Sequence, residues 1–262
     1  MRFPNRRGIA LVAAIMLMVF ATIAVFGVVT FITERLRQLP IEETFLKAIY
    51  LARAGVDNAV YYFRFRDLTG NGYFSLGQTN IDANNFFVLG GTAANLLMVD
   101  TFGSVVQSSN RSVAIWPMHN ATDSETITIT TMTVSWSGIP ANRRLKEIWL
   151  GNTPTLVWSG SGTSGSVFNI ADFTLDLAPA IYTANRLLFS HSIKNGVVTV
   201  TFNMTDGSSR SLTLYPASNN YNFTINSMGK TVGSNIYRTI TADYNARTGQ
   251  ITNYAEINAP VP

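Results

Sequence analysis

The first 33 residues of this chain limit the folds open to it more than any other segment. A basic leader, MRFPNRRG, precedes an apolar run from Ile9 to Thr33 that contains no Asp, Glu, Lys, Arg, Asn or Gln. About 20 apolar residues in an α-helix cross the hydrocarbon core of a bilayer, at ~1.5 Å per residue, and this run is slightly longer. The apolar core of a secretory signal peptide has only about 7–15 residues. The run therefore fits a retained membrane span better than a cleaved signal.

The charges around this run predict its orientation. Arg2, Arg6 and Arg7 all precede it, and cationic flanks stay on the cytoplasmic side of a membrane. The N-terminus is therefore expected in the cytoplasm, and everything after Thr33 outside the cytoplasmic membrane.

Two segments resemble a known family. Arg6-Arg7-Gly8 before an apolar helix resembles the type III leader of type IV pilins and pseudopilins. The segment AIYLARAGVDNAVYYF, from Ala48 to Phe63, resembles the YLAEAG(L/I)(E/D)xA signature of PilX-like minor pilins. The residues that match this signature are Tyr50, Leu51, Ala52, Ala54, Gly55, Asp57 and Ala59. The resemblance covers about the first quarter of the chain.

This resemblance implies a processing step and a set of partners. A prepilin peptidase would cut after Gly8, and the new N-terminal residue, Ile9, would be N-methylated. The helix would lie in inner-membrane lipid before assembly. It would then pack among other pilins or pseudopilins, in a type IV pilus-like filament or in the periplasmic filament of a type II secretion system.

One departure from the family pattern concerns Ala13. Most major pilins carry Glu as the fifth residue of the mature chain, where it neutralises the terminal amine of a neighbouring subunit. An unpaired charge in an apolar filament core is costly, so a subunit with Ala13 cannot compensate its neighbour in that way. Ala13 therefore favours a minor, tip or initiation subunit. If the chain were a major subunit, Glu34 is the nearest acid that could take the compensating role.

The helix is expected to continue beyond the membrane to about residue 64. Apolar side chains recur there at steps of three and four residues, the spacing of one helical face. That face comprises Phe45, Ala48, Ala52, Val56, Ala59, Val60 and Phe63. Pro40 is expected to kink or break the helix, because it lacks an N–H and clashes with the preceding turn. We expect the face to pack on the protein's own globular domain, and filament packing to involve the part before Pro40.

The rest of the chain is typical of β-structure. Segments such as TITITTMTVSWSG and NGVVTVTFNMTDG alternate apolar residues with Thr or Ser between turn residues. Hairpin turns are predicted at Asn195-Gly196, Asp206-Gly207 and Thr248-Gly249. The fold class is therefore α+β, a long N-terminal hydrophobic pilin-like helix followed by an antiparallel β-sandwich-like domain.

Four segments follow from these patterns. They are a leader peptide, a transmembrane and filament helix, an irregular region that wraps the helix or forms a small subdomain, and a β-sandwich-like extracytoplasmic domain, over residues 1–8, 9–64, 65–123 and 124–262. Strand alternation points Trp136 inward. Trp158, which precedes a Ser-Gly-Ser-Gly run, is the better candidate for an exposed binding surface.

Composition favours an exported structural protein. The chain has no cysteine, so its stability must come from its core. Loss of Arg2, Arg6 and Arg7 with the leader leaves 16 Lys and Arg against 15 Asp and Glu. No basic tract survives that would predict nucleic-acid binding, and no nucleic-acid partner is expected, which leaves open only DNA binding through one local patch.

The sequence contains little that could support catalysis. His119 and His191 are the only histidines, they lack metal-site spacing, and no nucleophile or phosphate-binding motif is present. Asp67, Thr69 and Asn71 have the spacing of the start of a calcium loop, but Gln78 stands where a bidentate Glu is needed. A Gly-Asn-Gly turn explains these residues as well. We expect neither an enzyme nor a cofactor or metal.

The sequence therefore predicts a minor pilin or pseudopilin whose β domain serves assembly priming, tip contacts or adhesion. The alternative is a permanently membrane-anchored extracytoplasmic binding module, such as a glycan-binding one, that does not enter filaments. Processing at Gly8 distinguishes the two.

Overall fold

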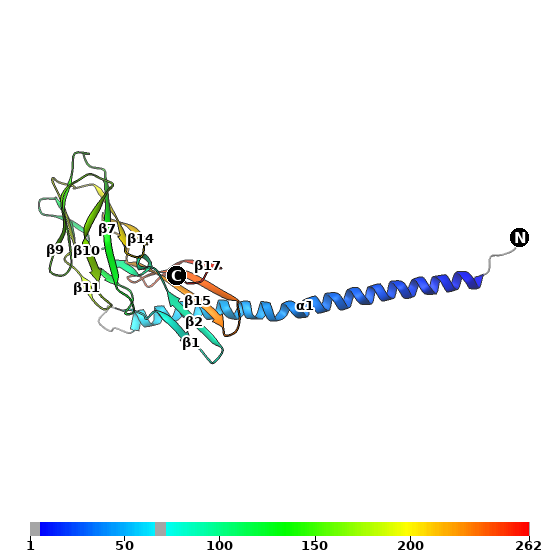
Figure 1. Cartoon of the computed structure of the whole chain (residues 1–262). Helices are drawn as coiled ribbons and strands as arrows, with labels where there is room; N and C mark the ends of the chain where they lie inside the picture. The colour runs from blue at the N-terminus through cyan, green and yellow to red at the C-terminus, as the bar shows by residue number, and fades with distance from the viewer. Residues whose placement is uncertain (1–5, 66–71, 262) are drawn as a thin grey trace. The chain divides into compact units, whose positions relative to one another are not determined.

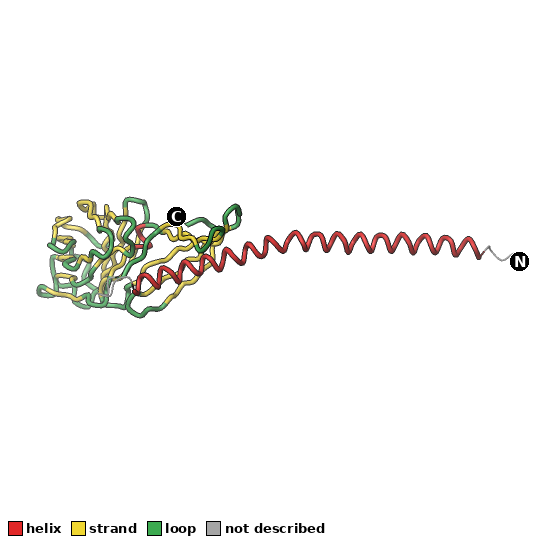
Figure 2. Tube along the Cα trace, turned by 90° about the horizontal axis from the view of Figure 1, so that it is seen from below, coloured by secondary structure: helices red, strands yellow, loops and turns green. Residues whose placement is uncertain are grey.

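The structure is a computed structural model that describes residues 6–65 and 72–261, with the side chains described from residue 14 onward. It confirms the α+β class, because one long apolar helix is followed by antiparallel sheets. Figure 2 shows that α1 (Arg6–Phe65) accounts for nearly all of the helix and that strands dominate the remainder. The chain forms two compact units, residues 1–46 and 47–262, which are described separately below.

The first unit contributes only helix to the described structure. α1 continues through Pro40, so the helix does not break there, and a kink at Pro40 stays a prediction. Proline removes one backbone donor, whereas the hydrogen bonds of the neighbouring turns remain, and helix propagation is cooperative. The Thr44 hydroxyl also donates to the Pro40 carbonyl, with an Oγ1–O distance of 2.7 Å.

The second unit begins with the last part of α1 and a five-stranded antiparallel sheet. In spatial order its strands are β1 (Gly77–Asn80), β2 (Asn85–Gly90), β15 (Asn222–Thr231), β16 (Tyr237–Asn245) and β17 (Ile251–Ile257). Apolar side chains of β15 alternate with polar ones, so that Phe223 and Ile225 are buried on the face that packs on α1. Figure 1 shows β1, β2 and β15 side by side along the helix.

A large insertion separates β2 from β15. It starts with the short helix α2 (Ala93–Leu96) and contains three further sheets. The four-stranded sheet is β10 (Ser166–Leu175), β7 (Ile127–Ser137), β13 (Val197–Met204) and β14 (Ser209–Tyr215). The second five-stranded sheet is β4 (Val105–Gln107), β5 (Ser112–Ala114), β12 (Arg186–Phe189), β8 (Leu145–Leu150) and β9 (Thr155–Gly162). A small sheet holds β11 (Ile181–Tyr182), β6 (Met118–Asn120) and β3 (Leu97–Val99).

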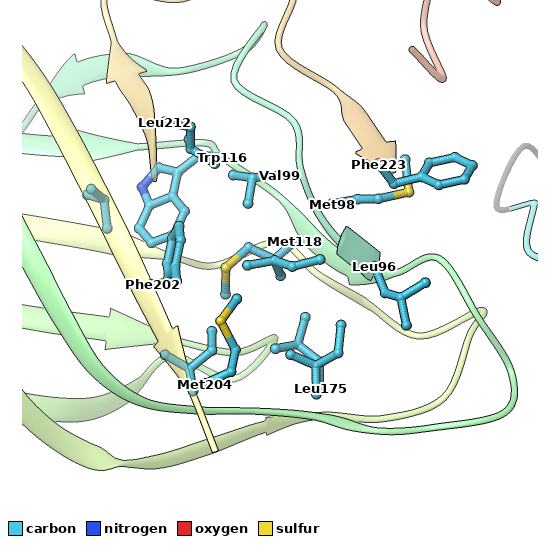
Figure 3. Packing of buried hydrophobic residues seen from close by; sticks show 14 of the residues in the cluster. Leu96, Met98, Val99, Trp116, Met118, Leu175, Phe202, Met204, Leu212 and Phe223 are labelled. Atoms are coloured by element: carbon cyan, nitrogen blue, oxygen red, sulfur yellow. The ribbon is translucent and has the colours of Figure 1, made fainter. Parts of the chain in front are cut away.

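Aromatic pairs join the two large sheets of the insertion into a sandwich. Trp136 of β7 meets Phe189 of β12 edge to face at 5.2 Å between ring centroids, so its predicted inward orientation is confirmed. Trp158 is half-buried and meets Phe168 at 4.6 Å, which corrects the expectation of a freely exposed ring. Figure 3 shows Trp116 beside Phe202 in the core, where their centroids lie 6.3 Å apart.

The sheets do not follow the boundary expected between residues 123 and 124. β2 pairs with β15, so that Gly90 lies opposite Asn226, and the first sheet joins both sides of that boundary. Residues 65–123 were expected to form an irregular wrapping region or a small subdomain, and their described part contains β1 to β6. The sandwich is therefore an insertion within a helix-and-sheet unit.

Two of the three predicted hairpin turns are confirmed. Asp206-Gly207 connects the paired strands β13 and β14, and Thr248-Gly249 connects β16 and β17. Asn195-Gly196 forms a turn but leads from β12 in one sheet to β13 in the other, so the hairpin predicted there is wrong. Turn residues specify a local reversal of the chain, whereas burial of the two sheet faces decides which strands pair.

Candidate membrane and filament helix

The first part of α1 exposes apolar side chains around its whole circumference. Within residues 14–46, exposed fractions reach 72% at Leu17 and 74% at Phe26. This stretch is long and apolar enough to cross a membrane, as an anchor or as a signal sequence. An apolar surface of this kind requires lipid or other apolar helices around it.

The hydroxyl groups in this stretch are satisfied within the helix itself. Thr22, Thr30 and Thr33 each donate to the carbonyl four residues earlier, at 2.8 Å. Transfer of an unpaired hydroxyl from water to hydrocarbon costs on the order of several kcal/mol. These hydrogen bonds avoid that cost and therefore suit a segment surrounded by lipid. The first charged side chains after the apolar run are Glu34 and Arg35, both exposed, with the Arg35 guanidinium 5.5 Å from the Phe31 ring centroid.

The predicted processing residues belong to the N-terminal end of α1. Gly8, Ile9 and Ala13 lie within its bounds. Their side chains fall outside the described residues, so the roles expected of them stay predictions.

The signature segment places its small residues toward the first sheet. Ala52, Gly55 and Ala59 are buried, as is Ala48 one turn earlier, whereas Tyr50 and Asp57 face outward. Leu51 and Ala54 are half-buried at the sides. The predicted apolar face is confirmed as the buried one, except that Phe45 and Val60 are only half-buried. The spacing of three and four residues keeps one stripe of small side chains against the strands.

Two glycines allow the helix and the sheet to approach backbone to backbone. A Cβ on Gly229 of β15 would overlap the Ala48 carbonyl oxygen and the Ala52 nitrogen. A Cβ on Gly55 would overlap the Ser227 hydroxyl and come within 2.8 Å of the Phe87 ring. The signature therefore has a packing role, because both elements need small residues where they cross.

The end of α1 is fixed by groups that the sequence analysis did not identify. The Arg64 Nε donates to the Tyr244 hydroxyl at 2.8 Å, and its guanidinium also reaches the Gly249 carbonyl at 3.2 Å. Phe63 packs on Phe223 at 4.6 Å between ring centroids. A basic residue in the last helical turn was the available signal, since cations favour helix C-termini.

His119, which sequence reasoning treated as an isolated histidine, is buried in β6. Its ring meets Tyr221 edge to face at 5.5 Å, and its Nδ1 lies 3.4 Å from the Tyr221 hydroxyl. Burial lowers the pKa of His119 to about 4, against the opposing effect of Asp100. The Nε2 has no hydrogen-bond partner among the described residues. The neutral imidazole is therefore part of the core.

A buried polar network ties the insertion to the back of the first sheet. Arg210 of β14 donates to the carbonyls of Ala94 and Asn222. Burial lowers the pKa of Arg210 to about 10, with Asp243 acting in the opposite direction. Asn226 of β15 completes the network by donating to the Asn95 side chain at 3.1 Å. These bonds satisfy polar groups that the junction would otherwise bury unpaired.

The described residues offer no convergent metal or catalytic group. Among them, no three His, Cys, Asp or Glu side chains gather closely enough to hold an ion. Asp67, Thr69 and Asn71 of the suggested calcium loop lie outside the described residues, while Gln78 is exposed in β1. Exposed His191 has its Nδ1 2.9 Å from the Ser190 hydroxyl.

Comparisons of the chain with protein-family models, with curated proteins and with solved structures find no match.

Proposed function

We propose that this chain is a minor pilin or pseudopilin of the PilX-like kind, with a structural role. The observation that carries the proposal is the division of α1 into a fully exposed apolar part and a part buried on the protein's own sheet. The first part suits lipid before assembly and neighbouring helices afterwards. The second holds the folded unit on that helix through the small residues of the signature segment.

The inserted sandwich supplies the surface that such a subunit would display. It emerges between β2 and β15, so it enlarges the folded unit without interrupting the contact between α1 and the sheet. Loops positioned by a rigid sandwich commonly carry recognition. We assign tip contacts, assembly priming or adhesion to this part.

Processing after Gly8 is the first prediction. Mass spectrometry of the protein from membranes with an active prepilin peptidase should find a chain that begins at methylated Ile9. Gly8→Val should leave the leader attached, because a bulky residue replaces the small one at the cleavage point. Gly27→Val is the matched control, since Gly27 has open space around it, and it should be processed normally. An intact Met1 start in the parent protein would contradict the proposal and favour the permanent anchor.

Low abundance in filaments is the second prediction. Ala13 removes the carboxylate that would pair with a neighbour's terminal amine, so most filament positions should disfavour this subunit. Quantitative mass spectrometry of sheared filaments should find far less than one copy per major subunit. Ala13→Glu should raise that ratio, whereas Ala14→Glu, with the same charge one residue away, should not. Dominance of the parent chain in filaments would refute the minor role.

A further inference from the structure

Three loops at one end of the sandwich form a surface that we call the basic cap. It comprises residues 108–111, 138–144 and 190–196, which connect β4 to β5, β7 to β8 and β12 to β13. Its charged residues are Arg111, Arg143, Arg144 and Lys194, with His191 beside them, and it contains no Asp or Glu. Beyond the leader the whole chain has 16 Lys and Arg, so a quarter of them lie in this one place.

Backbone hydrogen bonds hold the three loops together. Phe189 N donates to the Arg111 carbonyl and Ile193 N to the Asn110 carbonyl, both at 2.7 Å. Ser190 N donates to the Arg144 carbonyl at 2.8 Å. The cations are therefore carried on one preformed surface, which reduces the conformational entropy lost on binding a ligand.

Anionic partners within the protein do not account for these charges. Arg111 and Lys194 are exposed, whereas Arg143 is half-buried and its buried Nε has no hydrogen-bond partner among the described residues. Arg111 and Arg144 donate to backbone carbonyls, which carry no net charge. The acid closest in sequence to the cap, Glu147, accepts a bond from the Trp149 indole at 2.7 Å. The cap therefore keeps a positive potential toward solvent.

We propose that the basic cap binds the phosphate backbone of duplex DNA. Its cations are distributed over three loops, which suits a polymer of regularly spaced phosphates better than one small anion. No Phe, Tyr or Trp lies in the three loops, so the cap has no such ring for stacking exposed bases or sugars. A duplex hides its bases and presents phosphates outside, so backbone contacts suffice for sequence-independent binding.

The test uses the full chain in neutral detergent and fluorescence anisotropy of a labelled DNA duplex of mixed sequence. Binding should weaken as salt rises, with a slope of about 0.9 in log affinity against log salt for each phosphate contacted. Arg143→Gln combined with Lys194→Gln should lower that slope by about 2 and weaken binding at least tenfold at low salt. Lys194 is exposed and the buried Arg143 Nε has no hydrogen-bond partner among the described residues, so the two substitutions break no side-chain hydrogen bond there and the variant should keep nearly the parent's thermal stability.

A charge-matched variant distinguishes binding at the cap from a general effect of the protein's net charge. Lys47→Gln combined with Lys230→Gln removes the same charge from α1 and β15, and it should bind DNA nearly as the parent does. Equal losses in the two double variants would refute a site at the cap. Equal or tighter binding of single-stranded DNA, or of dextran sulfate with the same dependence on the cap, would refute preference for duplex DNA. Absence of salt-dependent binding by the parent would refute the proposal outright.

Discussion

Gly229→Ala is expected to destabilise the folded unit by about 3 kcal/mol, near the upper end of the usual cost of overpacking. The added methyl group would overlap the backbone of α1 at Ala48 and Ala52, and a backbone cannot rotate away as a side chain can. The helix must therefore move off the sheet, which loosens the packing of Phe63 on Phe223 as well. Chemical denaturation of the full chain in detergent, followed by far-ultraviolet circular dichroism, measures the loss.

Gly91→Ala is the matched control for this substitution. Its Cβ would meet the nearest atom, Asn95 Cβ, at 3.4 Å, an ordinary contact distance. The free energy of unfolding should therefore change by less than about 1 kcal/mol. Equal effects of the two substitutions would mean that α1 and β15 are not in backbone contact.

Gly55 provides a second measure of the same contact. Gly55→Ala should cost less than Gly229→Ala, because the atoms it meets belong to the side chains of Ser227 and Phe87. The Ser227 hydroxyl is buried without a partner among the described residues, so Ser227→Ala should be neutral or stabilising. Combining Ser227→Ala with Gly55→Ala should recover part of the loss, as a double-mutant cycle would show.

The features that could be predicted from the sequence are those set by short-range patterns. The spacing of Ala48, Ala52 and Ala59 identified the buried helical face, and strand alternation identified the inward side of Trp136. The Asp206-Gly207 turn specified its hairpin because both strands lie within a few residues of it. In each case one local periodicity or turn decides the outcome.

Long-range pairing could not be predicted in the same way. β2 and β15 are separated by the whole insertion, and the residues of either strand alone do not predict its partner. They pair because both strands bury apolar side chains against α1, and this contact exists only in the folded unit. Pro40 shows the converse case, because the helix continues through it: the lost hydrogen bond of one proline does not break a long cooperative helix.

The same reasoning explains why only one of the two surfaces to which we assign roles was anticipated. The signature segment is continuous in sequence, so a family resemblance could identify it before its packing was known. The basic cap draws Arg111, Arg144 and Lys194 from three loops far apart in sequence, so no basic tract appears. The absence of such a tract led to the expectation of no nucleic-acid partner. The DNA-binding experiment on the basic cap tests that expectation.

The second large effect is expected from pH and depends on His119. Its pKa is lowered from 6.5 to about 4 in the folded protein, so the imidazole binds protons more tightly in the unfolded chain than in the folded one. Stability from this group is complete above pH 6.5 and is lost as the pH falls from 6.5 toward 4. Between pH 7 and 5 the free energy of unfolding should fall by about 2 kcal/mol.

The groups around His119 support the assignment of this pH dependence to its imidazole. Tyr221 faces the ring, and burial raises the pKa of Tyr221 to about 12, so its hydroxyl stays neutral over this range. Asp100 is the nearby acid and is ion-paired with Arg247, whose guanidinium lies 4.4 Å from the Phe102 ring centroid. Asp82 and Asp206 have pKa values lowered below 3.8, so their contributions to stability are lost at lower pH.

Two histidine variants make the pH prediction specific to the buried ring. His119→Gln replaces the imidazole with a group that does not titrate, so its unfolding free energy should change by less than about 0.5 kcal/mol between pH 7 and 5. His191→Gln removes the exposed histidine and should keep nearly the full pH dependence of the parent. The four tryptophans all lie in the insertion that contains β6, so their fluorescence reports unfolding of this region. An equally steep pH dependence in His119→Gln would show that another group titrates in this range and that the His119 imidazole is accessible to protons in the folded state.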